Sequence, residues 1–205
     1  MPKTEALVQF HDRAVSEPGW DGSTAGLDSD DPALWQAIAR NHLCNIGLWQ
    51  EEDQARRTDV PAERVVASKR RIDCLNQERN DAAEAVDAAL LKKLAAYPSL
   101  PGARLHSETP GAMIDRLSIL ALKIFHMQAQ LQRPEVDAVH LAHCSDKLHR
   151  LRVQRSELAS CLHELLEQVR AGTACFHAYR QFKMYNDPAL NPWLSRQTQD
   201  RTLSN

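Results

Sequence analysis

The sequence has few of the residues that build strands and turns. Seven glycines and ten prolines make up about 8% of the chain, where average usage gives roughly 12%. Valine and isoleucine together supply only 16 of the 205 residues, whereas alanine and leucine contribute 27 and 25. Because β-branched residues suit a pleated surface and alanine and leucine favour helices, this composition argues against a β-sandwich or a barrel and favours an all-α fold.

Long apolar runs and paired cysteines are also missing. No window approaches 18 consecutive apolar residues, so we expect no transmembrane segment. The first fifteen residues lack the apolar stretch of a signal peptide. The five cysteines are odd in number and form no CxxC pair, which is typical of free thiols in a reducing compartment. Together these absences predict a cytoplasmic protein.

Neither sign of charge dominates. The 25 basic and 27 acidic residues leave a formal net charge of -2, which does not support a dedicated nucleic-acid partner. The hydrophobic fraction of 43% is large enough for a core.

Apolar spacing and helix-start signals define the expected elements. Asp31-Pro32 and Thr109-Pro110 each place a capping side chain before a proline in the first helical turn. We expect one domain over 1–205: an all-α, four-helix-type bundle with an additional N-terminal helix and a docked aromatic C-terminal tail. The predicted ranges are a short helix over 4–16, main helices over 31–57, 61–96, 109–132 and 135–171, and the tail over 173–205.

Two of these helices carry polar residues where a core-facing stripe is expected. The 3-4 spacing that places leucines on one side of 135–171 selects His42, Asn45 and Trp49 in 31–57, and Asn76 and Arg79 in 61–96. Buried charges cost several kcal/mol unless they are paired. The stripes are therefore either a structural salt-bridge network or the walls of a hydrophilic cleft between helices, a usual place for a ligand in a bundle.

A cleft of this composition suits a phosphorylated sugar or a nucleotide sugar. Guanidinium groups such as that of Arg79 bind oxyanions with two donors, and amides such as those of Asn45 and Asn76 bind hydroxyls. Trp49 is either a stacking platform for a ring or a core residue.

Long motifs resemble a bacterial family of uncharacterised proteins, domain-of-unknown-function family number 4254. The resemblance rests on NHLCNIGLWQEEDQAR (41–56), KRRIDCLNQERND (69–81), ETPGAMIDRLSILALKIFHM (108–127) and QFKMYNDPALNP (181–192), and extends over roughly 4–192. It implies an all-α cytoplasmic protein, often encoded near glycosyltransferases and surface-polysaccharide genes, without an activity to transfer. The motifs and the polar stripes together select the expected ligand-binding residues: Asn45, Trp49, Glu52, Asp53, Arg56, Lys69, Asp73, Asn76, Arg79, Asn80, Glu108, Asp115, Arg116 and Lys123.

Metal chemistry is the main alternative. Glu84-Ala-Val-Asp87 is an ExxD pattern of the kind that holds magnesium in all-α nucleotide hydrolases, with Glu52 and Asp53 as further carboxylates. The upstream ExxE of those enzymes is missing. A second pattern places Asp137, His140 and Cys144 on one helix face, where a transition metal could bind, but packed or solvated histidines are the favoured interpretation.

The favoured function is a cytoplasmic accessory or ligand-binding protein of glycan biosynthesis that needs no metal or cofactor. A glycosyltransferase or another glycan-assembly protein is the expected partner. The alternatives are a magnesium-dependent hydrolase of nucleotides or sugar phosphates, and a helical scaffold that forms homo-oligomers.

Overall fold

The computed structural model describes residues 2–27, 30–181 and 189–192, and it confirms the all-α fold. Each predicted helix is present, with ends within about three residues of the predicted range. The elements are α1 (Thr4–Ser16), α2 (Pro32–Ala55), α3 (Ala62–Leu94), β1 (Arg104–His106), α4 (Pro110–Leu131), α5 (Ala138–Arg170) and β2 (Ala174–Phe176).

The two expected capping signals operate, and a glycine ends a third helix. The Asp31 carboxylate accepts a hydrogen bond from the backbone N–H of Leu34 at 3.1 Å and starts α2. The Thr109 hydroxyl accepts one from Ala112 at 3.2 Å and starts α4. Gly172, just after α5, has φ +74°, a left-handed conformation that ends helices and that glycine adopts without steric cost.

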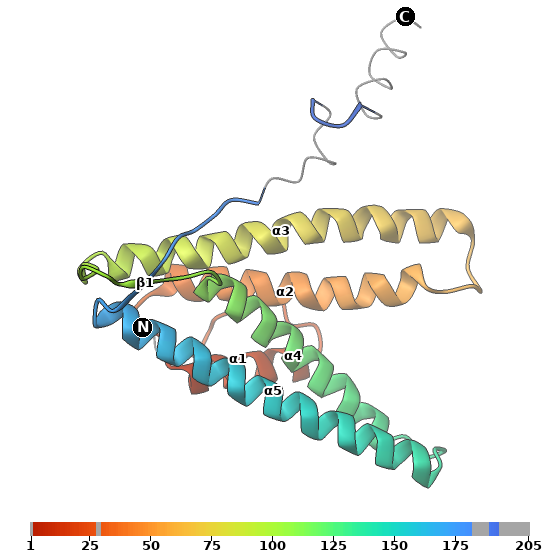
Figure 1. Cartoon of the computed structure of the whole chain (residues 1–205). Coiled ribbons are helices and arrows are strands. Elements are labelled where there is room, and N and C mark those ends of the chain that lie inside the picture. The colour runs from red at the N-terminus through yellow and green to blue at the C-terminus, as the bar shows by residue number, and fades with distance from the viewer. Residues whose placement is uncertain (1, 28–29, 182–188, 193–205) are drawn as a thin grey trace, which may run out of the picture.

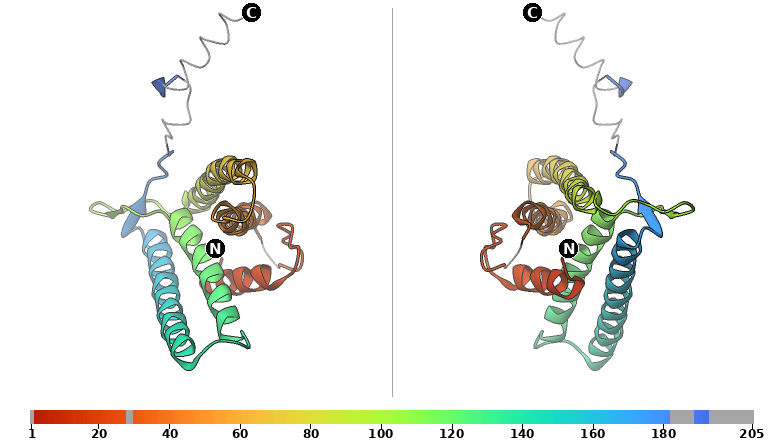
Figure 2. Two further views of the ribbon diagram at one scale, coloured as in Figure 1. Left: turned by 90° about the vertical axis from the view of Figure 1, so that its right-hand side faces the viewer. Right: turned by 90° about the vertical axis from the view of Figure 1, so that its left-hand side faces the viewer.

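The four long helices form two hairpins, α2–α3 and α4–α5, which diverge from the end of the molecule where β1 lies (Figure 1). α1 crosses beside α2 and packs on α4 and α5 (Figure 2). The apolar core fills the closed end, where Phe10, Ile38, Leu90, Leu117 and Leu162 are all at most 2% exposed. The other ends of the hairpins are splayed, so polar residues on their facing sides can reach solvent.

Arg155, a largely buried cation of α5, forms an ion pair with a residue of another helix. Arg155 interrupts the leucine stripe of α5 and donates a hydrogen bond of 2.5 Å to the Asp12 carboxylate of α1. The ion pair explains why a cation is tolerated there and helps to fix α1 on α5.

A small parallel sheet was not predicted. Leu105 in β1 is opposite Cys175 in β2, and the sheet joins the loop after α3 to the chain after α5. Three-residue strands carry no alternating pattern, and these two are separated by about 70 residues, so no local signal predicts their pairing.

The expected docked aromatic tail falls mostly outside the described residues. Within them, the backbone N–H of Gln181 donates to the Glu84 carboxylate at 2.9 Å, which places this point of the chain on α3. Phe182, Tyr185 and Trp193 lie beyond the described ranges, so docking of the aromatic tail remains a prediction. In the described part of the chain, no helix is both long and apolar enough to span a membrane.

Candidate functional site

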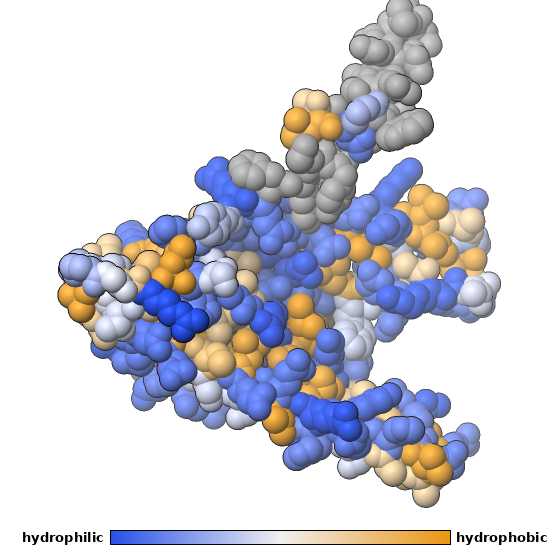
Figure 3. All heavy atoms as spheres, in the orientation of Figure 1, coloured by the Kyte–Doolittle hydropathy of each residue, from blue (hydrophilic) through white to orange (hydrophobic). Residues whose placement is uncertain are grey.

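A polar cleft of about 470 Å³ opens where α2 and α3 face α4. It lies on the splayed side of the molecule, where the space-filling view is hollowed between the two hairpins (Figure 3). Its apolar floor consists of Leu48, Ile119 and Leu122. Its polar walls are formed by Asn45, Trp49, Glu52, Asp53 and Arg56 of α2 and by Asn76 and Arg79 of α3.

A buried hydrogen-bond network supports the base of the polar cleft. The side-chain amides of Asn41 and Asn45 donate to the same oxygen of Asp115, Oδ1, at 2.9 and 2.8 Å. Asn45 also donates to the Ser118 hydroxyl at 2.9 Å. Because a half-buried carboxylate needs its lone pairs satisfied, the two asparagines hold Asp115 on α4 against α2 and fix this corner of the cleft.

Arg79 is the cation at the base of the polar cleft. Its side chain is 27% exposed, and its Nε lies 3.9 Å from Asp115 Oδ2. That distance allows an ion pair and is too long for a hydrogen bond. Nε is buried without a hydrogen-bond partner in the described structure. A guanidinium can bind an oxyanion with two donors, and that of Arg79 lines the polar cleft.

Two neighbouring histidines, His42 and His11, continue the network away from the cleft. His42 Nδ1 lies 2.7 Å from the Ser118 hydroxyl, and its ring lies 4.7 Å from that of His11 on α1. Burial lowers the pKa of His42 to about 4, although the backbone of His11 acts in the opposite direction. Burial, then His42 and Arg155, lower the pKa of His11 well below its usual value. Both rings are therefore neutral near pH 7.

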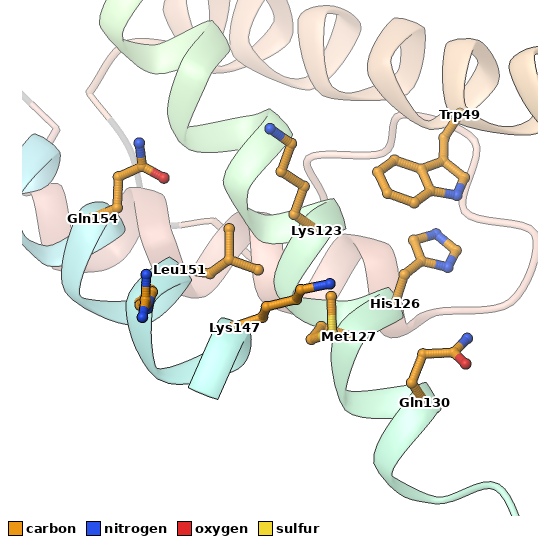
Figure 4. Close-up of a pocket in the computed structure, with 9 residues that line it drawn as sticks. Trp49, Lys123, His126, Met127, Gln130, Lys147, Leu151 and Gln154 are labelled. Carbon is orange, nitrogen blue, oxygen red and sulfur yellow. The ribbon is translucent and has the colours of Figure 1, made fainter. Parts of the chain in front are cut away.

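Trp49 forms the boundary between the polar cleft and a second pocket. Its indole stacks face to face on the His126 imidazole, with ring centroids 4.3 Å apart and planes at 1°. Burial lowers the pKa of His126 below its usual value, and the negative charge of Asp53 in the polar cleft acts in the opposite direction. The second pocket, of about 490 Å³, lies between α4 and α5, and Trp49 lines both spaces (Figure 4). We call it the basic pocket because Lys123, Lys147 and Arg150 line it.

The structure brings together part of the predicted ligand-binding set. Seven of the fourteen residues line the polar cleft, Asp115 lies behind two of them, and Lys123 lies in the basic pocket. The other five lie elsewhere: Lys69 pairs with Asp73 at 3.4 Å on the surface of α3, Arg116 pairs with Glu108 at 2.6 Å, and Asn80 bonds Gln181.

Of the four carboxylates of the magnesium alternative, Glu52 and Asp53 line the polar cleft, whereas Glu84 and Asp87 make structural contacts. Asp87 is buried and accepts a hydrogen bond of 2.6 Å from the backbone N–H of Gly111 at the start of α4. Burial raises the pKa of Asp87 against the opposing effect of its hydrogen bonds. Glu84 binds the backbone of Gln181. Within the described residues, no group of three or more His, Cys, Asp or Glu side chains is placed to hold a metal ion.

The Asp137, His140 and Cys144 face of α5 has a similar local role. The Asp137 carboxylate caps the helix by accepting from the backbone of His140 at 2.7 Å, and the His140 ring lies 3.3 Å from the Cys144 sulfur.

Sequence reasoning missed three members of the buried network: His11, Asn41 and Ser118. Asn41 precedes Asn45 by four residues and Ser118 follows Asp115 by three, so each lies on the same helix face as a predicted residue. This spacing could have identified them. No spacing links His11 to His42, because α1 and α2 meet only in the folded chain.

The fold and the site together define the class of the protein: an all-α helical protein with a polar cleft between its helices. A family model described as Protein of unknown function (DUF4254) matches residues 35–178. The chain belongs to this family, as the motifs predicted, and the match spans both helical hairpins. No curated protein and no solved structure matches the chain significantly.

Proposed function

We propose that this protein binds a phosphorylated sugar or a nucleotide sugar in its polar cleft, as a cytoplasmic accessory protein of glycan biosynthesis. The observation that carries the proposal is Arg79, a partly exposed guanidinium that lines a cleft of ligand size and lies 3.9 Å from Asp115, too far for a hydrogen bond. An oxyanion of the ligand would complete its donors and repay part of the cost of burying the guanidinium.

The other cleft residues suit the sugar. Carboxylates such as those of Glu52 and Asp53 accept hydrogen bonds from hydroxyl groups, and the amide of Asn76 both donates and accepts. Arg56, which already contacts Glu52 at 2.9 Å, supplies a second cation at the mouth. The Trp49 indole offers an apolar wall for a sugar ring. The cleft thus offers cations that can bind a phosphate, and it also offers acceptors for hydroxyl groups.

Thermal unfolding with a ligand panel tests the proposal. The panel holds hexose 1-phosphates and their uridine diphosphate derivatives, with the free hexoses and inorganic phosphate for comparison. A ligand at 100 times its Kd adds about 2.7 kcal/mol of stability, so the melting temperature should rise with the phosphorylated sugars. Arg79→Gln and Arg56→Gln should each reduce the rise.

Arg64→Gln is the matched control, because Arg64 is exposed on the same helix, away from the cleft. Equal shifts in Arg79→Gln, Arg56→Gln and Arg64→Gln would place the ligand outside the polar cleft and overturn the proposal. So would the absence of any shift across the panel.

A further inference from the structure

The basic pocket differs from the polar cleft in charge. Lys123 of α4 and Lys147 and Arg150 of α5 line it, and among the described residues no carboxylate does. Arg150 is paired with Asp146 at 3.0 Å, whereas neither lysine forms an ion pair within the described chain. Among the described residues, the pocket therefore has cations but no carboxylate along a mainly apolar lining, in contrast to the polar cleft, which two arginines and two acids line.

The walls between these cations are apolar and aromatic. Met127 and Leu151 line the pocket, with Trp49 and His126 stacked at one edge and Lys147 extending from α5 toward α4 (Figure 4). Such a wall suits a flat ring better than a hydrated ion. The side-chain amides of Gln130 and Gln154 also line the space, and amides can pair with the polar edge of a base.

The two spaces are consecutive along α4. Ile119 and Leu122 line the polar cleft, and Lys123 and His126 line the basic pocket. One helical turn rises about 5.4 Å, so a ligand that passes Trp49 would extend from one space into the other. Each space lies in the usual range of ligand pockets, about 300–1,000 Å³.

We infer that the basic pocket binds a nucleoside diphosphate, with its base between the apolar walls and its phosphates reaching from Lys123 and Lys147 toward the polar cleft, where Arg79 is a further cation. The ligand of the polar cleft is then a sugar attached to that diphosphate. Only this sugar end rests on the proposed function, because the nucleotide end is carried by the basic pocket alone. An alkyl phosphate would leave both glutamine amides unused, and inorganic pyrophosphate would leave the apolar walls unused.

Calorimetric titration of the whole chain tests the inference with ligands that lack a sugar: uridine diphosphate and adenosine diphosphate, with inorganic pyrophosphate and dodecyl phosphate for comparison. At least one nucleoside diphosphate should bind more tightly than both comparison ligands. Lys123→Gln/Lys147→Gln should raise its Kd about tenfold or more, since each charged hydrogen bond contributes roughly 1.5–3 kcal/mol. The matched control is Lys3→Gln/Lys92→Gln, which removes the same charge from two exposed lysines outside both spaces.

Several outcomes would overturn the inference, and they are separable from failure of the proposed function. If pyrophosphate bound as tightly as the nucleotides, the site would recognise charge alone. If dodecyl phosphate did, the site would recognise an alkyl chain. Equal loss in the two double variants would show a general charge effect. Loss in Arg79→Gln but not in Lys123→Gln/Lys147→Gln would place the nucleotide in the polar cleft. Binding of hexose 1-phosphates without any binding of nucleoside diphosphates would overturn the inference and leave the proposed function standing.

Discussion

At the scale of single residues, the geometry of the polar cleft depends on which partners the two oxygens of the Asp115 carboxylate contact. Asp115 Oδ1 accepts from Asn41 and Asn45, and Oδ2 faces Arg79 at 3.9 Å. The asparagines satisfy the carboxylate so that it does not need to hold Arg79 tightly. The nearby negative charge of Asp115 stabilises the guanidinium without a hydrogen bond between them, an arrangement compatible with the proposed anion site.

The buried pair His11 and His42 makes stability depend on pH. An unfolded histidine titrates near pH 6.5, while burial lowers the folded pKa of His42 to about 4 and that of His11 well below its usual value. Between these values the unfolded chain binds more protons, so stability is complete above about pH 6.5 and falls as the pH falls toward 4. For His42 alone the loss is on the order of 3 kcal/mol. The positive charge of Arg155, which is paired with Asp12, is a smaller cause of the low pKa of His11 than burial and His42.

Urea unfolding at pH 7 and pH 5 measures this effect. We expect the free energy of unfolding to fall between the two, and to fall less in His11→Leu, which removes one titrating ring from the core. His143→Gln, a change at an exposed histidine of α5, should leave the wild-type dependence unchanged. The same fall in His11→Leu as in the wild type would show that His11 is not a source of the pH dependence.

At the scale of elements, α4 is central because it contacts all four other helices. Its start packs directly on α3, and Gly111 makes this approach possible. A Cβ on Gly111 would fall against the Ala83 carbonyl oxygen and within 2.9 Å of the Asp87 carboxylate, which bonds the Gly111 N–H. The α3–α4 contact thus requires a residue without a side chain at this position.

Gly111→Ala should lower the free energy of unfolding by about 1–3 kcal/mol, because overpacking forces backbone shifts. Gly47→Ala in α2 is the matched change, since its Cβ would meet only the flexible Leu75 side chain at 3.2 Å and alanine gains about 1 kcal/mol in helix propensity. Urea unfolding compares the two. Equal effects would contradict the close α3–α4 approach.

At the scale of the whole molecule, two hairpins meet in an apolar core at one end and diverge at the other (Figure 1). A smaller apolar cluster of Cys44, Leu48, Ile72 and Leu75 packs α2 on α3. The sides on which the two hairpins face each other across the open end can therefore carry polar residues at positions where the 3-4 spacing expects apolar ones. Both the polar cleft and the basic pocket involve Trp49, at the point where the hairpins separate. The divergence of the hairpins leaves part of their facing surfaces unburied, and the same divergence opens the candidate site.

Local signals predict the helices well and the candidate site only in part. Capping by Asp31 and Thr109 is a property of neighbouring residues, so the helix starts follow from the sequence. The polar stripe also predicts that Asn45 and Arg79 converge. It cannot separate them from Lys69, which has the same spacing but pairs with Asp73 at the surface, because the splay of the hairpins decides which turns of a stripe face a neighbour. The β1–β2 pairing and the contact between the His11 and His42 rings are likewise long-range.

Calorimetric titration with hexose 1-phosphates and uridine diphosphate hexoses, in wild type, Arg79→Gln and Arg64→Gln, tests the binding role of the polar cleft most directly. We predict that the wild type and Arg64→Gln bind one molecule per chain with the same Kd. Loss of a charged hydrogen bond of roughly 1.5–3 kcal/mol should raise the Kd of Arg79→Gln about tenfold or more. Unchanged binding by Arg79→Gln, or no binding by the wild type, would contradict the assignment of the polar cleft as a sugar-phosphate site.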